Sequence, residues 1–102
     1  MNSRIPVKID LDLKDLIPNY LKNREGDISN CKMDLAKKDF KHISEIGHKI
    51  RGNAATYGFI ELSSIGERLE LSALSQNSSD TEKALKEFEN YLQNIEIEYV
   101  KV

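Results

Sequence analysis

The chain has 102 residues, with 15 Lys or Arg and 17 Asp or Glu, so its formal net charge at pH 7 is −2. This length suits a single domain spanning residues 1–102, and an apolar content of 39% is enough for a hydrophobic core. The balanced charge argues against nucleic-acid binding, and no apolar run approaches the ~20 residues of a membrane span. One cysteine, Cys31, and an N-terminus unlike a signal peptide favour the cytoplasm.

The first eleven residues are expected to form an extended arm. Ile5, Val7 and Ile9 alternate with other residues, as in a half-buried strand. Nothing later in the sequence predicts a second strand that could pair with them. The arm, residues 1–11, is therefore expected to lie alone on the surface of the domain.

A long first helix is predicted from about residue 13 to 37. Asp12 can cap its first turn, and apolar residues then recur at gaps of three and four. Pro18 lies inside this pattern and lacks a backbone N–H, so it is expected to bend the helix, and Gly26 is a second weak point. The apolar positions are Leu13, Leu16, Ile17, Tyr20, Leu21, Ile28, Cys31 and Leu35.

Three further helices are predicted after residue 38. Asp39 is expected to cap the second, the third begins near Gly58, and the Ser-rich stretch 75–80 separates the third from the fourth. Ser79 and Glu82 have the spacing of a capping box for the fourth helix. The inward positions of that helix are Leu85, Phe88, Leu92, Ile95 and Tyr99.

These elements predict an all-α fold, an up-down antiparallel four-helix bundle with an extended N-terminal arm. Short connections make successive helices antiparallel. The core aromatic residues are expected to be Tyr20, Phe40, Phe59, Phe88 and Tyr91. A bundle that closes its own core has no need of a second copy, so a monomer is expected.

The segment from residue 47 to 58, GHKIRGNAATYG, is not explained by core formation alone. At ~100° per residue, Ile43 and Ile50 lie ~200–220° from His48, which places His48 on the solvent side. Arg51 lies one turn along and brings a permanent cation beside the imidazole. Gly52 in a helix interior costs ~1 kcal/mol relative to alanine, which close approach of another molecule would offset. The same face carries Lys41, Ser44, Glu45 and Ala55.

This arrangement predicts a phosphoryl acceptor. An exposed imidazole offers a neutral, nucleophilic ring nitrogen near pH 7, and Arg51 could neutralise a phosphoryl group on it. Glu45 could orient the ring, but no acid–base partner with clear geometry is apparent beside it. His42 lies ~120° around the helix from His48, and neither Cys31 nor a carboxylate pair completes a site, so no metal site is expected.

The segment from His48 to Gly58 resembles the signature of histidine phosphotransfer (HPt) domains. That signature is a histidine, any residue, an aliphatic residue, Lys or Arg, Gly, any residue, a small residue, and a Gly at the eleventh place. Residues 62–70, which close on Leu69 and Glu70, are similar to the family's following helix, and the resemblance extends over about residues 12 to 95. Arg51 replaces the commoner lysine, and Asn53 stands where a small residue is frequent.

The resemblance implies a phosphoryl carrier of a two-component phosphorelay. His48 would accept a phosphoryl group, on Nε2, from a phospho-aspartyl receiver domain or a (hybrid) histidine kinase, and pass it to another receiver aspartate. Arg51 would stabilise the phosphoryl group and Gly52 would let the receiver approach. The other residues expected at the receiver contact are Lys41, Ser44, Lys49 and Ala55. No cofactor is expected on this chain, because in this family Mg²⁺ and the acidic pocket belong to the receiver, and the chain would not itself be an enzyme.

Two other functions are weighed against phosphotransfer. A docking bundle could bind a receiver or kinase without transfer, but it would have no need of the histidine. A histidine kinase is rejected because the chain lacks a glycine-rich nucleotide-binding segment. The dimerising stalk of such a kinase usually has an acidic residue directly after the histidine and a proline soon afterwards, whereas Lys49 follows His48 and no proline follows Pro18.

Overall fold

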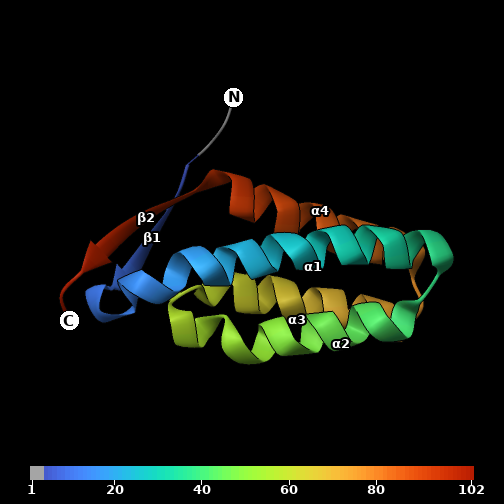
Figure 1. The fold of residues 1–102 in the computed structure, drawn as a ribbon. Coiled ribbons are helices and arrows are strands. Elements are labelled where there is room, and N and C mark those ends of the chain that lie inside the picture. Colours follow the sequence, from blue (N-terminus) through green and yellow to red (C-terminus); the bar gives the residue numbers. More distant parts are fainter. Residues whose placement is uncertain (1–3) are drawn as a thin grey trace.

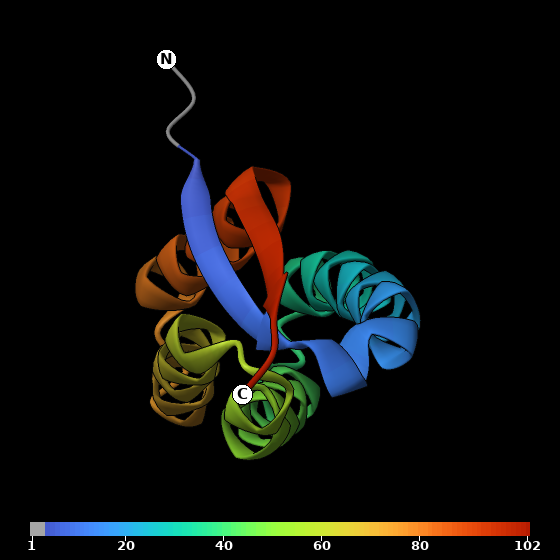
Figure 2. The same ribbon diagram turned by 90° about the vertical axis from the view of Figure 1, so that its left-hand side faces the viewer.

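The computed structural model describes residues 4–102, so residues 1–3 of the predicted arm lie outside the described residues. Its four α-helices are α1 (Ile17–Lys37), α2 (Phe40–Asn53), α3 (Ile60–Leu74) and α4 (Ser78–Asn94). Figure 1 shows α1 and α4 stacked over α2 and α3, and the view along the axis in Figure 2 shows the four helices surrounding one core. The predicted four-helix bundle is confirmed. Within the described part of the chain, none of the helices has the length and apolar character needed to span a bilayer.

The prediction that the N-terminal arm has no partner strand is wrong. β1 (Ile5–Asp10) pairs in parallel with β2 (Ile95–Val100), with Ile5 opposite Ile95 and Asp10 opposite Val100. Ile95 and Tyr99 therefore lie in a strand and not in the fourth helix, although both still pack against the core. The two strands cross one end of the bundle (Figure 2), where the side chain of Ile9 is fully buried.

The start of the first helix also differs from the prediction. Residues Leu11–Leu16 form a 3₁₀ helix, η1, whose N-cap is Asp10, which accepts a hydrogen bond from the Asp12 backbone N–H at 2.9 Å. Pro18 then occupies the first turn of α1, where a backbone N–H has no partner within the helix, so proline is favoured there. The predicted bend at Pro18 is thus a change of helix type, and α1 continues through Gly26.

Of the three predicted N-caps, Asp39 is confirmed, and Asp12 is wrong because Asp10 caps η1 and no side chain caps α1. Asp39 caps α2, accepting from the His42 backbone N–H at 3.1 Å. Gly58 ends the short 3₁₀ helix η2 (Ala55–Tyr57) with a φ of +96°, a conformation that favours glycine. The capping box is wrong: α4 begins one residue before Ser79, and its cap is Asn77, which accepts from the Asp80 backbone N–H at 2.9 Å.

The core contains the predicted apolar residues except Leu16, which lies in η1 and is 53% exposed. All five predicted core aromatics are buried, and Tyr20 and Phe59 stack with ring centroids 5.6 Å apart. Cys31 has no exposed surface, and this burial raises the pKa of its thiol to about 12. The thiol is therefore protonated at neutral pH and packs as a small apolar group.

Candidate functional site

The His48 side chain stands on the outer face of α2. It is 63% exposed, whereas Ile43, Ile46 and Ile50 of the same helix are buried. The amphipathic pattern of α2 thus points its apolar side into the bundle and leaves the imidazole accessible from solvent. This is the orientation that the sequence predicts.

Two glycines bring α3 unusually close to this part of α2. A Cβ atom added to Gly47 would lie 2.7 Å from the Glu70 backbone nitrogen, and one added to Gly66 would lie 2.7 Å from the Arg51 backbone nitrogen. Any larger residue at either position would push the two helices apart. The contact places the Glu70 side chain, on α3, beside the residues that surround His48.

Glu70 contacts His48, a contact that the sequence analysis did not predict. Its Oε2 lies 2.8 Å from Nδ1 of His48, and its side chain is only 12% exposed. An ionised carboxylate only accepts hydrogen bonds, so Nδ1 must carry the ring proton and donate it. The other ring nitrogen, Nε2, then keeps its lone pair and faces solvent. Glu45, the predicted orienting residue, has no hydrogen bond to the ring among residues 4–102; Glu70 performs that role.

Arg51 completes a group of three side chains at this site. Its Nη1 lies 3.4 Å from Oε1 of Glu70, and its Nη2 lies 3.4 Å from Nδ1 of His48. Because Nδ1 and the guanidinium are both donors, the second contact is not a hydrogen bond, and the attraction that holds Arg51 is its ion pair with Glu70. Arg51 is 44% exposed, so its guanidinium can still turn toward a ligand on the imidazole.

The residues expected at the partner contact fall into different environments. Lys41, Lys49 and Gly52 are exposed, and a Cβ added to Gly52 would meet nothing within 4 Å. Ser44 is 93% hidden, contrary to its predicted position on the solvent side, and its hydroxyl donates to the Lys41 carbonyl at 2.7 Å. It lies toward the side of α2 that packs on α3. Ala55 is exposed but lies in η2 beyond the end of α2, so it does not continue the helical face.

Three hydrogen bonds, two made by Ser63 and one by Tyr20, hold the end of α2. The Ser63 hydroxyl donates to the Arg51 carbonyl at 3.1 Å and accepts from the Ala55 backbone N–H at 3.0 Å. The Tyr20 hydroxyl donates to Oδ1 of Asn53 at 2.7 Å. Burial raises the pKa of Tyr20, so this hydroxyl remains protonated and able to donate. Asn53 therefore acts as a hydrogen-bond acceptor that ties α2 to α1.

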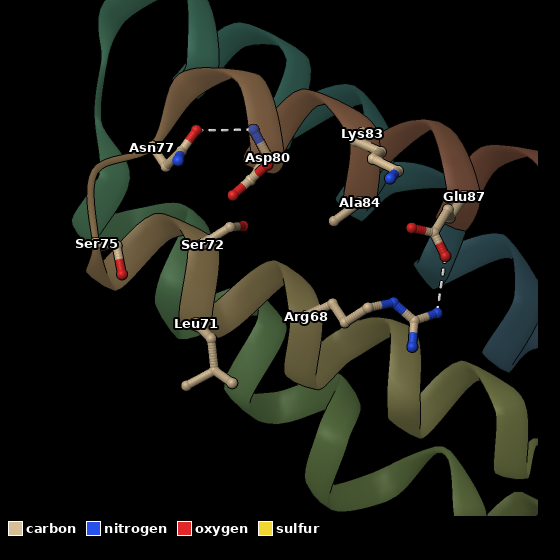
Figure 3. A pocket seen from close by; sticks show the side chains of 9 residues that line it. All are labelled: Arg68, Leu71, Ser72, Ser75, Asn77, Asp80, Lys83, Ala84 and Glu87. Atoms are coloured by element: carbon tan, nitrogen blue, oxygen red, sulfur yellow. Dashed lines mark hydrogen bonds and ion pairs between the residues drawn. The ribbon is translucent and has the colours of Figure 1, made fainter.

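A separate hollow between α3 and α4 offers no comparable chemistry (Figure 3). Arg68 donates to Glu87 across it at 2.8 Å, and its remaining charged residues are Lys83 and Asp80. Two cations and two anions leave no net charge that would select an ion. None of its lining residues belongs to the group around His48.

The fold is thus a four-helix bundle, and the exposed His48 imidazole on it is oriented by a carboxylate and flanked by a cation. The sequence matches the Hpt domain family over residues 15–98, and the chain belongs to that family. It is also 30% identical over 57 residues to multistep phosphorelay regulator 1 of Schizosaccharomyces pombe, a match that covers 56% of this chain and 19% of that protein. No solved structure gives a significant match.

Proposed function

We propose that this chain carries a phosphoryl group on Nε2 of His48 within a two-component phosphorelay. The observation that carries the proposal is the 2.8 Å contact between Glu70 and Nδ1, which leaves Nε2 as the nucleophilic nitrogen on an exposed ring. Membership of the Hpt family and the similarity to a phosphorelay regulator support it. The donor and the acceptor would be aspartates of receiver domains, with a histidine kinase as an alternative donor.

The transfer needs no proton acceptor on this chain. The Nε2 lone pair attacks the phosphorus of an aspartyl phosphate, the N–P bond forms, and the P–O bond to the aspartate breaks with its electrons leaving on the carboxylate. The ring then carries a proton on Nδ1 and a phosphoryl group on Nε2, so it gains positive charge. Glu70 stabilises that charge through the existing hydrogen bond, and Arg51 faces the phosphoryl oxygens. The second transfer reverses these steps.

The partner would supply what this site lacks. Among residues 4–102, the carboxylates that line the hollow at His48 are Glu45 and Glu70, and Glu70 is already paired with His48 and Arg51. Mg²⁺ sites in phosphoryl transfer use oxygen ligands from the protein and the phosphate. Mg²⁺ would therefore be held by the receiver. This chain would be the substrate from which, or to which, the receiver transfers the phosphoryl group. The exposed surface at Gly52 would let the receiver backbone approach the imidazole.

A transfer assay with a phosphorylated receiver tests the proposal. The chain is mixed with the phosphorylated receiver and Mg²⁺, and protein-bound phosphate is measured for stability in base and lability in acid, as expected for phosphohistidine. His48→Gln should abolish the label, and His42→Gln, which removes the other histidine, should leave it unchanged. Label that survives His48→Gln would contradict the site, and a chain that binds the receiver without acquiring label would support a docking module.

The role of Glu70 is tested in the same assay. Glu70→Gln keeps an acceptor oxygen for Nδ1 but removes the charge, so transfer should slow moderately. Glu70→Ala removes both, and a charge-assisted hydrogen bond worth ~1.5–3 kcal/mol predicts a rate roughly 10–100-fold lower. Equal rates for Glu70→Ala and the parent chain would remove Glu70 from the mechanism.

A further inference from the structure

The corner between α1 and α2 brings together three side chains that the sequence separates. Lys38 adopts a left-handed conformation with a φ of 59°, which reverses the chain. Its backbone N–H donates to the Leu35 carbonyl at 3.1 Å, and that of Asp39 donates to the Asp34 carbonyl at 2.8 Å, the pattern of a Schellman turn. The turn places Asp34, from the last turns of α1, beside Asp39 and His42 in the first turn of α2.

Asp34 is a buried carboxylate whose partner carries a positive charge only when protonated. Its side chain is 9% exposed, and its Oδ2 lies 2.5 Å from Nδ1 of His42. The ion pair found for Asp34 within residues 4–102 is with this imidazole, which is 48% exposed. The ammonium of the nearby Lys38 points elsewhere, to the Ser78 hydroxyl at 3.4 Å. A buried carboxylate is normally paired with a cation, and this imidazole is a cation only when it is protonated.

Asp39 adds a second carboxylate to this pair. Ligand atoms of Asp34, Asp39 and His42 all lie within 4.8 Å of one another. One oxygen of Asp39 accepts the His42 backbone N–H, and the side chain is exposed, which leaves its other oxygen for a ligand. In a tetrahedral zinc site, ligand atoms lie roughly 3.3 Å apart. Because the largest separation is 4.8 Å, the ligand atoms need to move together by about 1.5 Å or less to reach that spacing.

From this geometry we propose that Asp34, Asp39 and His42 bind one divalent transition-metal ion, with zinc as the best-suited ion and water completing its coordination. One imidazole nitrogen and two carboxylate oxygens suit zinc, whereas Mg²⁺ and Ca²⁺ prefer ligand sets of oxygen alone. The metal would bind His42 at Nδ1, the nitrogen that faces Asp34, and the neutral ring would then carry its proton on Nε2.

The site is distinct from the one around His48. His42 and His48 are six positions apart on α2, a rise of ~9 Å along the helix. His48 has one carboxylate partner, and the guanidinium of Arg51 stands beside it, so a metal cation is repelled there. At the corner the metal joins the end of α1 to the start of α2. It therefore binds the folded chain and stabilises it, and this inference does not depend on phosphotransfer.

Calorimetric titration of the chelator-treated full chain with zinc chloride tests the proposal. One ion per chain should bind, and excess zinc should raise the melting temperature by roughly 5–10 °C. Cobalt(II) gives an independent readout through its visible absorption band. No saturable binding, or binding that leaves the melting temperature unchanged, would overturn the proposal.

Matched variants locate the ion. Asp34→Asn and His42→Gln should each weaken zinc binding at least ~10-fold, and Asp39→Ser, which keeps a helix-capping oxygen, should weaken it as well. His48→Gln is the control and should bind zinc like the parent chain. Because Asn and Gln could disturb folding, circular dichroism without metal accompanies each variant, and the comparison uses those that retain the parent spectrum. Unchanged binding in folded His42→Gln, or binding lost only in His48→Gln, would refute the assignment.

Discussion

Two glycines of α2 should respond to the same substitution with opposite changes in stability. Gly47 faces α3, where a Cβ would lie 2.7 Å from the Glu70 backbone nitrogen, whereas a Cβ at Gly52 would meet nothing within 4 Å. Neither glycine has a positive φ, so alanine fits the backbone at both positions. Gly47→Ala and Gly52→Ala thus form a matched pair that differs only in what the added methyl group contacts.

The magnitudes follow from these contacts. At Gly47, ordinary contact begins near 3.4 Å, so α2 and α3 must separate locally by about 0.7 Å. The atoms met are all backbone and cannot rotate away, so the cost should lie in the upper part of the ~1–3 kcal/mol range for overpacking. After the ~1 kcal/mol helix preference of alanine is subtracted, a net loss of ~1–2 kcal/mol predicts a melting temperature lower by roughly 5–15 °C. The same shift lengthens the 2.8 Å bond between His48 and Glu70 beyond the ~3.2 Å limit of a hydrogen bond. At Gly52 only the helix preference acts, so the melting temperature should rise by about 4 °C.

Thermal melts by circular dichroism and the receiver transfer assay measure both effects. Gly47→Ala should be less stable and transfer more slowly, because Glu70 moves away from His48. Gly52→Ala should be more stable yet also slower, because the methyl group obstructs the receiver. A Gly47→Ala chain as stable as the parent, or a Gly52→Ala chain that is less stable, would show that the reasoning from helix contact is wrong.

Three further predictions concern stability alone. Burial raises the pKa of the Cys31 thiol from 9.0 to about 12, so with rising pH the unfolded chain loses this proton before the folded chain does. The free energy of unfolding should therefore fall from pH 9 to 12 by up to ~1.4 kcal/mol per pH unit. The urea midpoints at pH 8 and pH 10.5 should differ less for Cys31→Ala than for the parent chain. In urea unfolding, Asn77→Ala should cost ~1 kcal/mol of stability and Ser79→Ala less than ~0.5 kcal/mol. A larger loss for Ser79→Ala than for Asn77→Ala would show that Ser79, and not Asn77, caps α4. Ile9→Ala should cost ~2–5 kcal/mol although it lies outside the helices, and a loss under ~0.5 kcal/mol would mean that β1 does not seal the core.

The sequence determined the features of this protein that depend on neighbours along the chain. The 3.6-residue periodicity places Ile43 and Ile50 inside the bundle and therefore puts His48 outside. This orientation does not depend on how the other helices are arranged. Asp39 lies directly before a helix that needs a cap, and Gly58 ends a helical turn with a positive φ. Each of these outcomes is decided within one or two turns of backbone, so local patterns suffice to predict them.

Only the tertiary structure decided which distant residues meet. Glu70 reaches His48 from 22 positions away because Gly47 and Gly66 let two helices approach, and no periodicity within α2 reports that contact. β1 pairs with β2 although almost the entire chain lies between them. The strand at residues 95–100 therefore has no local hairpin signal, and the apolar residues in it were predicted to continue the fourth helix. The pairing of Asp34 with His42 likewise depends on a non-glycine residue, Lys38, in a left-handed turn. Such contacts depend on how the elements pack in three dimensions, which the order of residues within one element does not encode.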